Sequence, residues 1–419
     1  MARHLSRVRR LRVAVESAGS SNYAQELSGS IASFDDVHFL SAEPTLTEEM
    51  LPDEGLVQSV LDHRQPIVGR RTCALELAAY MTSGGALDDA ASPAADAEWG
   101  FGKLLQTIMG GYLAAAGSTE SGSASSTASS VTVDTGHGAR WGTRTAAGIV
   151  RNGRLECRPV DSVAGDVLSI GIPFGGAPAN AVDIYNARTF HFVSDPDEAL
   201  QFLLESADRE AIHWLLGMQG TVAFAFTPMQ NLQATFSLQG ADWKQDNDVG
   251  TPVGGSAIAV ASYDGSDPIP FRDSCVHLTP VASPQATDDL DVSTIELALN
   301  FAYEPIGSPC GVNGVRRMHF NPQRPLVTGS FVFPKDSGTT KGNIRTWQDA
   351  RANRTSYRTA IQVGHVPGAA WLFECPIIRI TDVSSVDANG IDSIRVAWEA
   401  LNGGTSSERA RSPIAIHAF

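Results

Sequence analysis

Apolar and polar side chains alternate with a period of two along residues 217–243, which read GMQGTVAFAFTPMQNLQATFSLQGADW. A polar, proline-containing turn at Thr227–Asn231 divides this stretch. The apolar positions on the two sides of the turn are Val222, Phe224, Phe226, Leu232, Ala234, Phe236 and Leu238. Because successive side chains of a strand point to opposite faces, the pattern predicts a hairpin with one apolar and one polar face. The polar face would carry Thr221, Gln233, Thr235 and Ser237.

The same alternation occurs in a second pair of segments, Thr294–Pro305 and Pro325–Pro334. Shorter apolar segments, separated by Gly, Pro and Asn turns, predict further strands. These lie at Arg70–Thr82, Val131–Val133, Ala146–Arg151, Val167–Ile172, Thr189–Val193, Tyr357–Val363, Trp371–Cys375, Ile377–Ile380 and Ile394–Trp398. We therefore expect a mainly β protein, an antiparallel β-sandwich or barrel with one or two short packed helices.

Three segments carry helical signals. In Ala97–Ala116 the apolar residues recur every three or four positions, which predicts a helix lying on a sheet. Short helices are also predicted at Asp197–Leu204 and Thr346–Asn353. Ser30–Leu61 mixes acidic residues with prolines, so we expect a long loop there with at most one helical turn.

The ends of the chain and one internal stretch are poor in core-forming residues. The start, MARHLSRVRRLRVAVESAG, clusters arginines before a very short apolar run, which predicts a basic arm entering a first strand rather than a secretory signal. Residues 117–130 are rich in Ser and Gly and predict a mobile or domain-joining loop. The tail SSERARSPIAIHAF ends in a strand-like segment suited to a sheet edge, its own or a neighbour's.

Size and charge narrow the function classes. At 419 residues the chain is long for one core, which favours two lobes or one lobe with long excursions. Its apolar runs are far shorter than the ~20 residues of a membrane span, so we expect no membrane insertion. The formal net charge of -15 opposes a conventional DNA-binding surface, which needs Lys and Arg to neutralise phosphates. An acidic surface would instead let DNA pass without holding it.

The ionisable and thiol residues show no recognisable catalytic or metal pattern. The five cysteines are scattered and form no CxxC pair, which argues against a disulfide framework or a zinc site. His191, His213 and His277 lie within apolar or strand-like segments and are expected to be ordinary packed or surface histidines.

Four short motifs are candidates for binding loops. Gly136–Gly142 leads into a strand-like segment, so a turn is favoured over a phosphate loop. Asp387–Asp392 has the oxygen side chains of a weak Ca²⁺ loop, but its Asn-Gly pair indicates a turn between strands. Asp246–Asp248 and Asp288–Asp291 are interpreted as loop charges. We expect no catalytic, cofactor-binding or metal-binding residue, and not an enzyme.

The order of these segments resembles that of the tail tube proteins of long-tailed bacteriophages, the major tail protein family. RRTCALELAAY followed by WGFGKLLQTIMG is similar to that family's strand and short helix ending in Gly. Residues 217–243 resemble its hairpin between glycines, and the run from RPLVTGSFVFPKD through Trp347 to the strand at Trp398 is similar too. The resemblance covers most of residues 60–402 and rests on the order of strands and glycines.

This resemblance implies a structural virion protein that self-assembles into stacked rings, forming the tube through which the genome leaves. Its partners would be further copies, as rings of three two-lobed chains or of six chains stacked head to tail. A tape measure protein, a tail terminator, a baseplate or tip, and a sheath in a contractile tail would also contact it. Double-stranded DNA would pass through transiently, and assembly would occur in the cytoplasm of the bacterial host.

The expected organisation is an N-terminal arm (1–30), a first tube-like lobe (31–250), a second tube-like lobe (251–402) and a C-terminal arm (403–419). The polar face of the first hairpin is a candidate channel wall, on which Asp and Glu should outnumber basic residues. The alternatives are another self-assembling virion protein, such as a tail terminator or capsid decoration, and a non-catalytic carbohydrate-binding β-sandwich. The last should expose a groove lined by several aromatic residues.

Overall fold

The computed structural model describes residues 2–4, 8–16, 24, 34–51, 67–84, 99–115, 119–120, 126–194, 196, 198–206, 212–226, 230–246, 268–271, 275–283, 288–290, 292–312, 315–336, 341–388, 390–404 and 407–419. The protein is mainly β and every described strand pair is antiparallel, as the sequence predicts. A large sheet and a smaller one contain the strands of these ranges.

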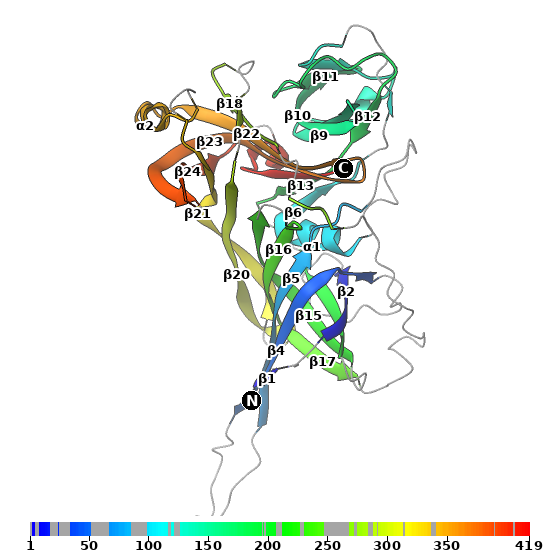
Figure 1. Ribbon diagram of the computed structural model, residues 1–419. Helices are drawn as coiled ribbons and strands as arrows, with labels where there is room; N and C mark the ends of the chain where they lie inside the picture. The colour runs from blue at the N-terminus through cyan, green and yellow to red at the C-terminus, as the bar shows by residue number, and fades with distance from the viewer. Residues whose placement is uncertain are drawn as a thin grey trace, which may run out of the picture.

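The two predicted hairpins form the middle of the large sheet (Figure 1). β15 (Ile212–Phe226) pairs with β16 (Gln233–Gly240), and β20 (Thr294–Val312) pairs with β21 (Val315–Pro334), which confirms both. The hairpins are also neighbours, because β15 pairs with β20 from Ala223 opposite Ala298 to Phe226 opposite Ile295.

Further strands extend the large sheet from this centre. On the β16 side lie β5 (Ile67–Tyr80), β4 (Phe39–Leu51) and β1 (Ala2–His4). On the β21 side lie β24 (Ile391–Leu401) and β23 (Ala369–Ala388). The first half of β15 pairs with β14 (Leu200–Ser206) and β17 (Asp242–Asp246); β14 continues to β2 (Val8–Val15) and β3 (Asp35–Asp36).

The first half of β23 joins this array to a second group of strands. One edge of β23 pairs with β22 (Ser356–Val366), followed by β18 (Cys275–Pro280) and β19 (Asp288–Leu290). The other edge pairs with β25 (Ala415–Ala418), followed by β13 (Arg188–Phe192) and β6 (Gly110–Leu113). The C-terminal strand was predicted at a sheet edge; it lies instead between two strands of its own sheet.

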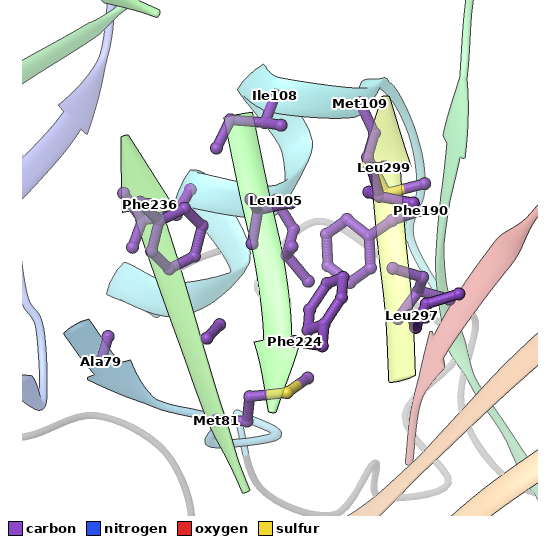
Figure 2. Close-up of a cluster of buried hydrophobic side chains, with 14 of the residues drawn as sticks. Ala79, Met81, Leu105, Ile108, Met109, Phe190, Phe224, Phe236, Leu297 and Leu299 are labelled. Atoms are coloured by element: carbon purple, nitrogen blue, oxygen red, sulfur yellow. The ribbon is translucent and has the colours of Figure 1, made fainter. Parts of the chain in front are cut away.

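The main core forms where the large sheet bends back on itself around α1 (Gly100–Met109). Phe224 and Phe226 of β15 each contact Phe373 of β23, with ring centroids 5.2 Å apart. Figure 2 shows Leu105, Ile108 and Met109 of α1 facing side chains of β15, β16 and β20, with Phe190 of β13 beside them. The helix thus fills the space inside the bend, as its apolar spacing predicts.

The three α-helices in the described part of the chain are short. α1 lies within the predicted range 97–116 but ends earlier, because Gly110 adopts a left-handed conformation (φ 77°) and starts β6. α2 (Ile344–Ala352) confirms the predicted helix around Trp347, with the Asn343 side chain capping its N-terminus. α3 (Glu408–Arg411) is a single turn in the C-terminal segment.

The smaller sheet has the order β7 (Thr119–Glu120), β12 (Asp183–Asn186), β9 (Thr145–Arg151), β10 (Arg154–Ala164), β11 (Val167–Ile170) and β8 (Ser130–Thr132). It has an apolar core of its own, which includes Val131, Ile149 and Leu168. The chain enters it after β6 and returns at β13, two strands that pair directly. The small sheet is therefore an excursion from one hairpin of the large sheet (Figure 1).

Two predictions of local structure were wrong. Ser30–Leu61, predicted as a loop, contains β3 and the 13-residue strand β4. The sequence of β4 has low strand propensity, and its hydrogen-bonded pairing with β5 stabilises the extended conformation. Asp197–Leu204, predicted as a helix, leads into β14, which lies between β2 and β15. Pairing on both sides outweighs the helical propensity of that segment.

The predicted boundary between residues 250 and 251 lies outside the described residues, as do residues 117–118 and 121–125 of the Ser/Gly-rich stretch. The described parts of that stretch belong to the small sheet, where Thr119–Glu120 is β7 and Ser130 starts β8. On either side of the predicted boundary, β15 and β20 share one sheet and their apolar residues share one core. Among the described helices, none is long and apolar enough to cross a membrane.

Candidate functional site

The polar face predicted for the first hairpin exists. Along β15 and β16 the apolar positions are buried, whereas Ala223, Ala225, Thr235 and Ser237 are exposed. Thr221 and Gln233 are half-buried on the same side. The alternation therefore separates a core face from a solvent face in the single chain, as the period of two requires.

This solvent face continues across neighbouring strands. Ser237 lies opposite Thr221 on one side and Glu76 of β5 on the other, and Glu76 lies opposite Glu43 of β4. A second row runs from Ala78 of β5 through Thr235, Ala223, Ala298 and Thr328 to Glu399 of β24. Most of these side chains are small or polar. We call the surface formed by these rows on β4, β5, β16, β15, β20, β21, β24 and β23 the polar sheet face.

Carboxylates outnumber guanidinium groups at the paired positions of the polar sheet face. The carboxylates are those of Glu43, Glu76, Glu296, Asp382 and Glu399, and the guanidinium groups are those of Arg379 and Arg395. Within it, Glu296 accepts hydrogen bonds from the Ser330 hydroxyl (2.7 Å) and from Arg395 (2.6 Å). These hydrogen bonds, with the Arg395 charge, lower the pKa of Glu296, so this carboxylate stays ionised at neutral pH.

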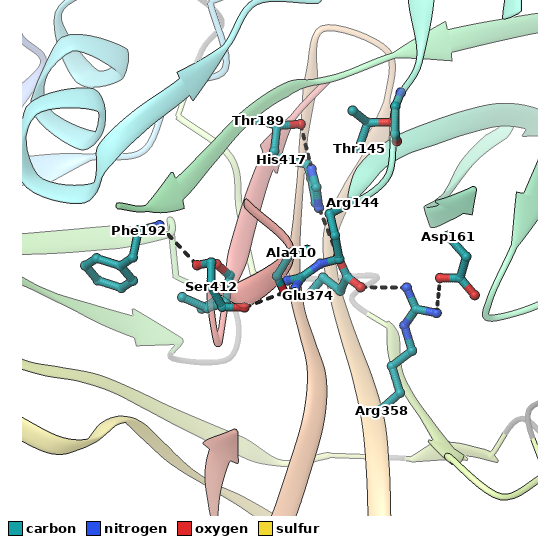
Figure 3. Close-up of polar contacts among 12 residues, drawn as sticks. Arg144, Thr145, Asp161, Thr189, Phe192, Arg358, Glu374, Ala410, Ser412 and His417 are labelled. Carbon is teal, nitrogen blue, oxygen red and sulfur yellow. Dashed lines mark hydrogen bonds and ion pairs between the residues drawn. The ribbon is translucent and has the colours of Figure 1, made fainter. Parts of the chain in front are cut away.

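A buried charge cluster joins the two sheets (Figure 3). Glu374 of β23 is fully buried and accepts from Arg144 Nε at 3.1 Å and from Arg358 Nη2 at 2.6 Å. Arg144 immediately precedes β9 of the small sheet, and Arg358 of β22 also pairs with Asp161 of β10. We call these residues, together with His417 beside Glu374, the Glu374 cluster.

The protonation states within the Glu374 cluster follow from its surroundings. Burial alone would raise the pKa of Glu374, but the charges of Arg144 and Arg358 outweigh it and hold that pKa far below its usual range. His417 lies 3.6 Å from Glu374. Burial lowers the pKa of His417, so its imidazole is neutral at physiological pH. The cluster is thus a charge-neutralised joint whose centre, Glu374, is fully buried, while Asp161 at its outer end is exposed.

The Glu374 cluster was missed from the sequence. The available signal was a single carboxylate inside the apolar run WLFECPII. A charge in such a run indicates a buried partner, but the sequence does not show that one partner is Arg358 on the preceding strand and the other is Arg144, 230 residues away.

A groove of about 860 Å³ lies beside the base of the β20–β21 hairpin. Phe192, Phe320, Leu326, Leu401 and Pro413 supply apolar lining, and Glu408 and Arg411 of α3 supply charge. Ser194 at this groove hydrogen-bonds to Glu408. No histidine or cysteine lines the described part of the groove, so its composition suits a packing surface better than nucleophilic chemistry.

The motifs considered as ligand loops have structural roles where they are described. The backbone N–H groups of Gly136 and Gly138 donate to Asp166, both at 3.0 Å, so a carboxylate of the same sheet occupies the place of an anion. Asp387–Asp392 spans the turn between β23 and β24, with Gly390 at φ 81°. Asp246 ends β17 and Asp288–Leu290 is β19; Asp248 and Asp291 lie outside the described residues.

The three histidines singled out in the sequence and three of the cysteines lie on six different strands. His213 and His277 are buried, on β15 and β18, and His191 lies on β13. Cys73, Cys157 and Cys375 are buried free thiols whose pKa burial raises, which keeps them protonated. Across the described ranges, no group of three or more His, Cys, Asp or Glu side chains is arranged to hold a metal ion.

No protein-family model matches the chain, and no curated protein matches its sequence. The function must therefore be inferred from the residues and their geometry.

Proposed function

We propose that this chain is a structural subunit that self-assembles into stacked rings, the tail tube of a long-tailed phage. The observation that carries the proposal is the polar sheet face: a broad, continuous β surface whose side chains are mostly small or polar and whose charged side chains are predominantly acidic. Such a surface suits a wall past which DNA moves, because like charge removes the attraction that would hold the phosphates.

The strand arrangement supports assembly rather than catalysis. β6 and β19 each pair on one edge only among the described strands, and exposed edges favour pairing with another chain. The β20–β21 hairpin continues beyond the residues that pair with β15 and β24, and Tyr303 and Phe320 of this extension are buried in the main core. Repeated head-to-tail contacts between such subunits produce open stacks.

The alternatives differ in what they would assemble into. A terminator or decoration protein would form isolated rings or surface knobs, whereas a tube subunit stacks along an axis. A carbohydrate-binding sandwich needs an exposed aromatic groove, but the large aromatic side chains Trp99, Trp371 and Trp398 are buried. The groove beside β20–β21 has Phe192 and Phe320 as its aromatic lining in the described part of the chain.

Electron microscopy of the purified full-length protein tests the proposal. We expect hollow tubes of stacked rings whose inner wall is formed by the polar sheet face. Symmetry analysis of one ring would then distinguish three chains from six. Particles without axial stacking, or a tube with this face on its outer surface, would refute the assignment.

A further inference from the structure

Residues 407–419, which we call the C-terminal segment, fill a cleft inside the large sheet. β25 pairs with β13 from His191 opposite Ala415 to Arg188 opposite Ala418. On its other side it pairs with β23, from Glu374 opposite Ala415 to Trp371 opposite Ala418. Without β25, the facing edges of β13 and β23 would both present unpaired backbone N–H and C=O groups in a buried place.

Specific side-chain and backbone contacts hold the C-terminal segment along its length (Figure 3). The Ser412 hydroxyl accepts from the Phe192 N–H at 3.0 Å, and the Ser412 carbonyl accepts from Arg144 Nη1 at 3.0 Å. His417 Nδ1 lies 3.0 Å from the Thr189 hydroxyl. The Phe419 N–H donates to the Ala370 carbonyl at 3.0 Å. Every residue from Ser412 to Phe419 is buried, so these contacts are shielded from water.

The C-terminal segment also contacts the small sheet. Arg144, which binds the Ser412 carbonyl, leads into β9 of that sheet. The Phe419 ring lies against Gly148 of β9, where an added Cβ would approach it to 3.0 Å. Phe419 shares an apolar cluster with Leu155 and Cys157 of β10 and with Leu372 of β23. The segment therefore touches both sheets at their junction, next to the Glu374 cluster.

We propose that the cleft between β13 and β23 is a peptide-binding site whose ligand is the C-terminal segment, and that the bound segment fastens the small sheet to the large one. The ligand class is an extended peptide that adds a strand. Its backbone pairs with two edges at once, which gives affinity. Specificity comes from Ile416 and Phe419 in apolar surroundings, from His417 beside Thr189, and from small residues at Ala415 and Ala418.

The test uses the full chain with a site-specific protease sequence inserted between Gly404 and Thr405. After cleavage, a fluorescent peptide of residues 407–419 is added, and its binding is measured by anisotropy during incubation in sub-denaturing urea, which speeds release of the resident segment. We expect the cleaved protein to take up the peptide. The uncleaved protein should exclude it, because the tethered segment competes at an effective concentration on the order of millimolar.

Two variant peptides report on specificity. A peptide with His417→Ala loses the contacts with Thr189 and Glu374 and should bind about tenfold more weakly. A peptide with Ile416→Asp places a charge in the buried cleft and should not bind measurably. A peptide with Glu408→Gln is the matched control: it removes the charge in the exposed turn of α3 but keeps an oxygen that can accept from Ser194, so it should bind within about twofold of the native sequence.

Hydrogen exchange tests the fastening role in the same sample. When the cleaved segment is washed out, amides of β9 and β10 should lose protection, and added peptide should restore it. Failure of the cleaved protein to take up peptide would overturn the binding site. Collapse of the β15–β20 part of the sheet on loss of the segment would do so as well, because the cleft would then not exist without its strand. Unchanged exchange of β9 and β10 after removal would overturn the fastening role. None of these results depends on tube formation.

Discussion

The core around α1 and the junction between the two sheets are both buried, yet they are built from different chemistry. Around α1 the contacts are aliphatic and aromatic, such as the edge-to-face pair of Phe101 and Phe236 at 5.7 Å. At the junction, Glu374, Arg144 and Arg358 bring charges out of water and neutralise one another. Apolar packing is tolerant of direction, whereas an ion pair requires a defined approach. The comparison indicates that charges orient the small sheet on a body held together by apolar packing.

The largest effect is expected in the core around α1. Phe236→Ala removes a fully buried ring between α1 and β16 and should lower the free energy of unfolding by about 3–5 kcal/mol, measured by urea denaturation. Thr235→Ala, one position away on the exposed face, is the control and should change it by less than about 0.5 kcal/mol. Equal effects of the two substitutions would contradict the assignment of faces along β16.

The junction should respond nearly as strongly to loss of one charge. Glu374→Gln leaves Arg144 and Arg358 without their shared buried counter-ion and should destabilise the protein by about 3 kcal/mol. Hydrogen exchange should localise the change to β9, β10 and β25. Asp392→Asn provides the matched control: it removes an exposed pair with Lys335 (2.7 Å) and should cost less than about 1 kcal/mol. If Glu374→Gln and Asp392→Asn lowered the free energy of unfolding equally, burial would not be what makes the Glu374 ion pairs stabilising.

A second buried carboxylate, that of Glu16, differs from Glu374 because its hydrogen-bond partners include no guanidinium group in the described contacts. Glu16 accepts from the backbone N–H groups of Ala24 (2.9 Å) and Gly217 (2.7 Å), and burial raises its pKa to about 7. The folded state therefore keeps a proton that the unfolded chain releases between pH 4.5 and 7, so stability should fall as pH rises through this window.

The measurement is urea unfolding of the wild type and Glu16→Gln from pH 5.5 to pH 8. Relative to the variant, the wild type should lose about 2 kcal/mol over this range. The Glu374 carboxylate, which is already ionised, should add no slope there. A difference between the two proteins that stays constant with pH would contradict the raised pKa.

The smallest effect on folding is expected on the polar sheet face. Glu76→Lys with Glu399→Lys should change the free energy of unfolding by roughly 0.5 kcal/mol or less, because the altered side chains lie on the solvent side of their strands. If assembled copies present this face to DNA, the double variant should retain double-stranded DNA at low salt and release it as salt rises. Asp183→Lys on the small sheet is the control, and equal DNA retention by it would argue against a special role of the face.

The sequence predicted those features that are encoded locally. The alternation of Val222, Phe224 and Phe226 with smaller residues identified β15, and the Asn-Gly turn at 389–390 identified the β23–β24 hairpin. β4 was missed because its prolines and acidic residues become a strand only beside β5. β14 was missed because Gln201, fully buried between two strands, belongs to a segment with helix-forming residues.

The candidate site also has one part that the sequence predicts and one part that it does not. The polar positions of the hairpin could be named from the pattern of Thr221, Thr235 and Ser237, because the period of two assigns them to one side. Whether Glu43 and Glu399 lie on the same face depends on which strands pair in the sheet, and no single segment of the sequence determines that order. The Glu374 cluster could not be predicted from the sequence for the same reason. Its residues come from β22, β23, the segment just before β9 and the C-terminal segment.

The point at which the small sheet leaves the large one has a practical consequence for protein engineering. Leu113 and Thr189 are direct partners in β6 and β13, so the polypeptide between them begins and ends a strand spacing apart. Foreign domains with closely spaced termini can therefore be grafted at this site without stretching the host sheet. A graft that replaces the whole small sheet must also replace Arg144, one of the two cations beside Glu374, and bring an apolar cover to Phe419. This position is thus a display site with defined chemical requirements.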